Sequence, residues 1–94
     1  MKLEAGRYEY PIKDCGGIEN AWIDAGGWDY ALCLVRYEEW AKMVREERIR
    51  SGEPVRAMPC YCAWVPSHAE LRVYPAPARD YDMRVLYRPM LREA

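Results

Sequence analysis

Residues 59–89 read PCYCAWVPSHAELRVYPAPARDYDMRVLYRP, and this stretch decides the fold class of the chain. Apolar side chains recur in it at every second position, the period of strands that turn one face towards a core. Turn-forming residues at 66–69 and 75–78 interrupt the alternation. The stretch therefore predicts a meander of three short strands, joined by a hairpin loop and a proline-rich bend.

Alternation also predicts which side chains share a face in each strand, because successive residues of a strand point to opposite sides. In the last two strands, Arg72, Asp82, Arg84 and Arg88 occupy the opposite face. The predicted shared faces are Met58, Cys60, Cys62 and Trp64 in the first strand, Leu71 and Val73 in the second, and Tyr81, Met83, Val85 and Tyr87 in the third.

A helix is predicted over residues 37–50. Tyr37, Trp40, Ala41 and Val44 recur at helical spacing and form one apolar stripe. Acidic residues begin the segment and arginines end it, as the helix dipole favours. Residues 51–54, with the sequence SGEP, supply the stop.

The first third of the chain gives shorter signals. Residues 7–13 alternate as a strand, and Pro11 places that strand at a sheet edge because proline cannot donate to a ladder. Residues 14–17 and 24–27 have turn composition, and residues 28–35 are nearly all apolar, which favours a buried strand. The whole chain, residues 1–94, is expected to be a single α+β domain: a small, mostly antiparallel sheet or sandwich with one covering helix.

Charge and hydropathy exclude several classes. The formal net charge is −1, whereas domains that grip nucleic acid carry a basic stripe. No apolar run reaches the roughly 20 residues that span a membrane, and the first residues are too polar for a signal peptide. We expect a protein of a reducing cytoplasm with its four cysteines as thiols.

Side chains typical of protein interfaces are abundant. The chain has 4 Trp and 8 Tyr but no Phe, and most of its basic residues are arginine. Trp, Tyr and Arg are enriched where proteins meet, although genome base composition alone can also raise the arginine content. A solvated sheet face is the alternative interpretation for the arginines. The interface candidates are Trp22, Trp28, Tyr61, Tyr74, Arg72, Arg84 and Arg88.

Cys60 and Cys62, with His68 nearby, are the residues whose chemistry could hold zinc. In an extended strand, however, residues i and i+2 stand about 6.5 Å apart, too far to chelate comfortably. Unpaired cysteines also behave as small apolar side chains. The sequence therefore predicts no catalytic residue, no cofactor and no metal. The alternative is a small monomeric protein-binding module, stapled by zinc through Cys60 and Cys62.

The region from 37 to 89 resembles the head-to-tail adaptor, or connector, proteins of tailed bacteriophages. In that family a helix with an aromatic anchor precedes a Gly-Pro stretch, a strand, a proline-rich bend, and an acid–Tyr pair that opens a final strand. The corresponding segments here are YEEW (37–40), GEP (52–54), PCY (59–61), LRVYPAP (71–77), DY (80–81) and LYRP (86–89). Members of the family usually begin with a helical bundle, whereas this chain opens with a strand.

The resemblance implies a structural virion protein with no enzymatic activity. It would form a homo-oligomeric ring, usually dodecameric in that family, in the neck between portal and tail. Its partners would be the portal and tail proteins, and DNA would pass through the ring without specific binding. It would be assembled in the bacterial cytoplasm, with no membrane partner. Head-to-tail contacts between copies of one small sheet close into such rings.

Overall fold

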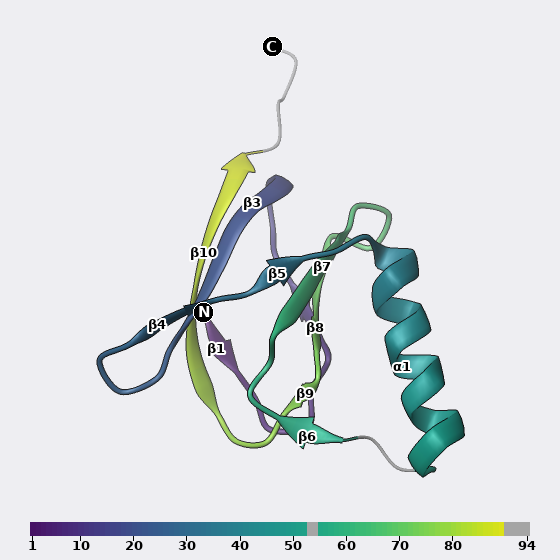
Figure 1. Cartoon of the computed structure of the whole chain (residues 1–94). Helices are drawn as coiled ribbons and strands as arrows, with labels where there is room; N and C mark the ends of the chain where they lie inside the picture. The colour runs from purple at the N-terminus through teal and green to yellow at the C-terminus, as the bar shows by residue number, and fades with distance from the viewer. Residues whose placement is uncertain (53–54, 90–94) are drawn as a thin grey trace.

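The fold is α+β, as predicted, and the described residues build three layers: one sheet, a second sheet, and a helix (Figure 1). This computed structural model describes residues 1–52 and 55–89. The two larger sheets enclose the core, and the helix covers the outer side of the second sheet. The prediction of a mostly antiparallel sheet or sandwich with one covering helix is confirmed.

The first sheet is antiparallel, with the strand order β1-β10-β3-β4. Its central pair consists of two long strands, β3 (Cys15–Asp24) and β10 (Tyr81–Pro89). The short strands β1 (Lys2–Leu3) and β4 (Asp29–Ala31) form its two edges. Each edge strand pairs with only part of its neighbour: β1 with the start of β10, and β4 with the end of β3. Most residues of β3 and β10 therefore pair only with each other.

The second sheet has the order β2-β8-β7-β5. A hairpin joins β7 (Tyr61–Val65) to β8 (Glu70–Tyr74), β2 (Glu9–Pro11) pairs antiparallel with β8, and β5 (Cys33–Leu34) pairs parallel with β7. Pro11 lies in the edge strand β2, as predicted. A separate parallel pair joins β6 (Arg56–Ala57) to β9 (Ala76–Pro77).

The main core lies between the two sheets, because each contributes the apolar face that alternation predicts. Met83 of β10 and Leu71, Val73 and Cys62 of the second sheet are fully buried there. The core cluster consists of Leu3, Tyr10, Ala21, Ile23, Leu32, Cys62, Leu71, Val73 and Met83. Cys60 departs from the predicted shared face: it precedes β7 and is exposed.

The helix α1 (Tyr37–Ser51) agrees with the predicted range to within one residue. Trp40 and Val44 of its apolar stripe are buried against Ala63 of β7. The helix ends at Gly52, whose φ of 73° is left-handed and whose N–H donates to the Arg48 carbonyl at 3.0 Å. Pro54, the other predicted stop residue, lies outside the described residues.

Three further sequence-based predictions, all about strands and turns, were wrong. The third strand of the predicted meander does not pair with the second: residues 75–80 carry the chain into the other sheet, where β10 pairs with the ten-residue β3. Residues 28–35 are not one buried strand, because β4 and β5 are exposed and only Leu32 between them enters the core. The turn predicted at 14–17 ends at Asp14, and Cys15 already begins β3.

Candidate protein interface

The hairpin between β3 and β4 extends away from the body of the molecule (Figure 1). Its loop is closed by the Ala25 N–H, which donates to the Trp28 carbonyl at 2.9 Å. Gly26 and Gly27 have φ angles of +68° and +99°, which glycine tolerates without strain. The turn composition of residues 24–27 thus brings Trp28 to the tip of an exposed hairpin.

Two aromatic side chains of this hairpin face solvent. Trp28 is 73 % exposed and Tyr30 is 47 % exposed. Large exposed aromatic residues mark surfaces that bind other proteins, because their burial yields much contact area at little conformational cost. Trp28 was a sequence-based candidate. Tyr30 was missed, although the alternation of Trp28 with Tyr30 after a Gly-Gly turn is the signal of a hairpin strand.

An acidic row crosses the sheet beside the loop of this hairpin. Asp82, Asp24 and Asp29 lie directly opposite one another on β10, β3 and β4. Like charges in such cross-strand positions cost about 0.2–1 kcal/mol each. Arg84 offsets part of this repulsion: its Nη2 lies 2.9 and 3.0 Å from the two carboxylate oxygens of Asp29.

Two positions further along these strands, a second row holds two of the predicted interface residues. Arg84 lies opposite Trp22, and Trp22 lies opposite Ala31. Arg88, further along β10, has its Nε 3.9 Å from a carboxylate oxygen of Glu19. Trp22, Arg84 and Arg88 therefore belong to the first sheet, whose hairpin loop carries Trp28, but Arg88 pairs with Gly17 at the other end of β3 and lies apart from the hairpin.

The other three candidates lie on the second sheet, on the side that α1 covers. Tyr61 and Tyr74 are cross-strand neighbours with ring centroids 6.4 Å apart. The Arg72 guanidinium lies 5.2 Å from the Tyr37 ring centre and 5.1 Å from that of Trp40, and its side chain is only 14 % exposed. The hypothesis that Arg72 shares one exposed sheet face with Arg84 or Arg88 was wrong, because the chain crosses between the sheets after Tyr74.

A groove lies at the opposite edge of the first sheet, where β10 extends beyond β1. It has a volume of about 380 Å³. Its walls come from β10, from the residue before β1, and from the end of β2 and the residues after it. The lining residues are Met1, Pro11, Ile12, Lys13, Val85 and Tyr87.

A second cavity, of about 260 Å³, lies near the C-terminal end of α1 and is lined in part by Glu47 and Tyr74. Burial, the hydrogen bond to Glu47 and its negative charge raise the pKa of Tyr74 to about 12. Glu47 is itself buried and also accepts a hydrogen bond from the Val55 N–H. These contacts join the end of the helix to β8, which is a structural role.

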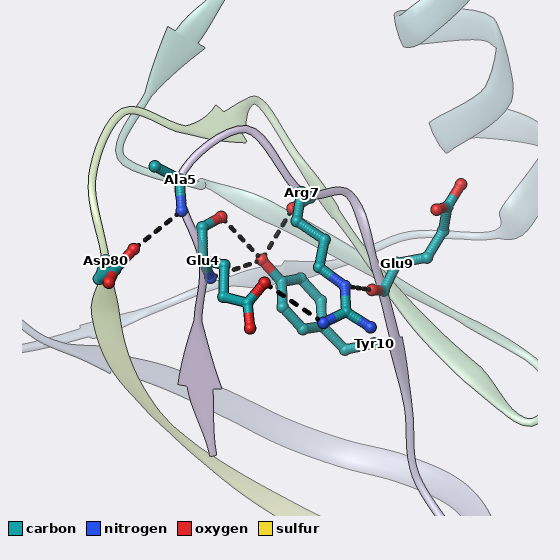
Figure 2. Close-up of polar contacts among 6 residues, drawn as sticks. All are labelled: Glu4, Ala5, Arg7, Glu9, Tyr10 and Asp80. Carbon is teal, nitrogen blue, oxygen red and sulfur yellow. Dashed lines mark hydrogen bonds and ion pairs between the residues drawn. The ribbon is translucent and has the colours of Figure 1, made fainter.

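A polar network around Tyr10 holds the turn between β1 and β2 (Figure 2). The Tyr10 hydroxyl donates to the Arg7 carbonyl at 2.8 Å and accepts from the Glu4 N–H at 3.0 Å. Asp80 accepts from the Ala5 N–H at 3.0 Å, which ties this turn to the start of β10. Backbone groups supply most of these contacts, so the network stabilises the fold.

The cysteines divide into two environments. Cys15 and Cys62 are buried, whereas Cys33 and Cys60 are exposed. Burial, with a smaller contribution from Cys33, raises the pKa of the Cys62 thiol to about 12. Within residues 1–52 and 55–89, no three His, Cys, Asp or Glu side chains are grouped so that they could hold a metal ion.

Comparison with known proteins finds no matching family model, no similar curated protein and no matching solved structure. In the described part of the chain, no helix has the length and apolar character needed to cross a membrane.

Proposed function

We propose that the chain is a structural subunit of a head–tail connector ring, a virion component that joins portal to tail and lets DNA pass. The proposal combines the resemblance of residues 37–89 to phage adaptors with one observation, the projecting β3–β4 hairpin that exposes Trp28. Under this proposal the protein has no enzymatic activity, and its partners are copies of itself and the portal and tail proteins.

The exposed aromatic side chains favour a protein that forms oligomers over one that remains monomeric. A chain of 94 residues buries only roughly 60–70 % of its unfolded surface, so its stability as a monomer is modest. Contacts with further copies add buried area and stabilise the folded state by mass action. Exposed Trp28 and Tyr30 are side chains that such contacts use.

Native mass spectrometry of the purified protein over a range of concentrations tests the proposal, together with electron microscopy of any large species. The expected result is a closed oligomer with one subunit count and no bound metal. A protein that stays monomeric, both alone and mixed with portal rings from the same virus, would contradict the proposal. A zinc-bound monomer would instead indicate the stapled binding module.

A further inference from the structure

The hairpin and the groove lie on opposite edges of one sheet. In the order β1-β10-β3-β4, the hairpin carries the β4 edge, and the groove lies beside β10 at the β1 edge. Pairing on this side of β10 ends where the Met83 N–H donates to the Met1 carbonyl at 2.8 Å. Val85 and Tyr87, further along β10, are therefore left to line the groove.

The groove has the chemistry to receive an aromatic side chain. Pro11, Ile12 and Val85 supply apolar walls, and Tyr87 adds a partly exposed ring. Its volume of about 380 Å³ and its position at the surface leave it open to a projecting group. Trp28 is such a group, because it sits at the tip of a narrow hairpin with most of its indole in solvent.

Charges at the two surfaces are complementary. Lys13 is the charged residue that lines the groove, whereas the segment 24–31 of the hairpin contains two aspartates and no basic residue. Asp29 is already engaged by Arg84. Asp24 is exposed and accepts one hydrogen bond, from the Gly27 N–H at 3.4 Å, so its carboxylate can also face Lys13. Opposite charges at the rim of an apolar contact favour correct docking over other orientations.

We propose that the β3–β4 hairpin of one copy docks in the groove of a second copy, with Trp28 inserted between Ile12, Val85 and Tyr87. This inference rests on the proposed ring and specifies the contact between neighbouring subunits, here called the joint. Because the contact uses two different surfaces on opposite edges, each copy offers one free hairpin and one free groove. Repetition of such a head-to-tail contact closes into a ring when the rotation permits.

Two single variants and one control test this joint. Trp28→Ala removes the inserted ring, and Tyr87→Glu places a carboxylate in the groove, facing the acidic hairpin. Both positions are exposed, so folding is expected to be unchanged. Ile49→Ala removes an 80 % exposed apolar side chain on α1, away from both surfaces, and is the matched control. Circular dichroism and melting temperature verify the fold of each variant.

Native mass spectrometry gives the readout. Wild-type protein and Ile49→Ala are expected to form the same oligomer, whereas each of the other variants alone is expected to be monomeric. Truncation of a central aromatic residue in an interface weakens the contact by about 30-fold or more. An equimolar mixture of Trp28→Ala and Tyr87→Glu is expected to give heterodimers, since the intact hairpin of one fits the intact groove of the other.

The outcomes separate the two proposals. If wild-type protein remains monomeric under all conditions, alone and with portal rings, the proposed ring fails and this joint fails with it. If wild-type protein forms rings and Trp28→Ala forms them at the same concentrations, only the joint is overturned. If both variants are monomeric but their mixture gives no heterodimer, the head-to-tail geometry is overturned.

Discussion

Cys60 and Cys62 are two positions apart in the sequence, but their thiols lie in different environments. Cys62 lies in β7 and enters the core between the sheets, whereas Cys60 precedes the strand and remains at the surface. The Cys60 thiol lies 3.5 Å from the carbonyl of Met58. One of the two thiols therefore lies in the core and the other at the surface.

Alkylation of the native protein should distinguish the four cysteines. At about pH 8, iodoacetamide is expected to modify Cys33 and Cys60 and to spare Cys15 and Cys62, because only accessible thiolates react. The raised pKa of Cys62 further lowers the fraction of its thiolate. Peptide mass spectrometry measures each site, and modification in denaturant provides the control. Modification of Cys62 at the rate of Cys60 would contradict the described burial.

At the scale of elements, α1 is held against the second sheet mainly through Trp40. Its indole N–H donates to the Val73 carbonyl at 2.8 Å, and its ring meets the Tyr8 ring edge-on at a centroid distance of 5.8 Å. The Arg72 guanidinium lies over the same indole. Trp40 thus links the helix to β8 by packing and by hydrogen bonding.

Replacement of this anchor is expected to destabilise the protein. Trp40→Phe removes the indole N–H and leaves the buried Val73 carbonyl without that donor, which costs about 1–3 kcal/mol in free energy of unfolding. Urea unfolding under monomeric conditions measures the change. Trp28→Phe makes the same replacement at an exposed position and is expected to change stability by less than about 0.5 kcal/mol. Equal losses in the two variants would rule out the anchoring role.

At the scale of the whole molecule, three tyrosines make the free energy of unfolding depend on pH in the alkaline range. Burial is the largest cause of the raised pKa of Tyr8, Tyr10 and Tyr74, and Tyr74 reaches about 12 from an ordinary value of 10.0. The folded protein therefore holds these protons more tightly than the unfolded chain does. The contribution of Tyr74 to stability is fully present below about pH 10 and is lost as the pH rises towards 12, and those of Tyr8 and Tyr10 are lost in the same direction.

Unfolding by urea at a series of pH values tests this coupling. The free energy of unfolding is expected to fall between about pH 10 and 12, and Tyr74→Phe is expected to make that fall less steep, because it removes the tyrosine whose pKa is raised to about 12. Tyr30→Phe, at an exposed position of the hairpin, is the control. An identical pH dependence in wild-type protein and Tyr74→Phe would contradict the prediction.

Local sequence determined the elements whose signals lie within a few residues. The helix, its glycine stop, the edge position of Pro11, the β7–β8 hairpin and the Gly-Gly turn before Trp28 all follow from periodicity and backbone preference. The α+β class follows from the same signals. These features need no knowledge of distant residues, because each depends on neighbouring φ and ψ angles and on one amphipathic face.

Tertiary structure alone decided which strand pairs with which, and therefore where the candidate interface lies. Alternation in β10 showed that it would be a strand but not that its partner would be β3, some sixty residues earlier in the chain. That pairing separates Arg84 from Arg72 and leaves the hairpin at one sheet edge and the groove at the other. The physical reason is that strand pairing joins residues far apart in sequence, and an apolar run does not specify its partner.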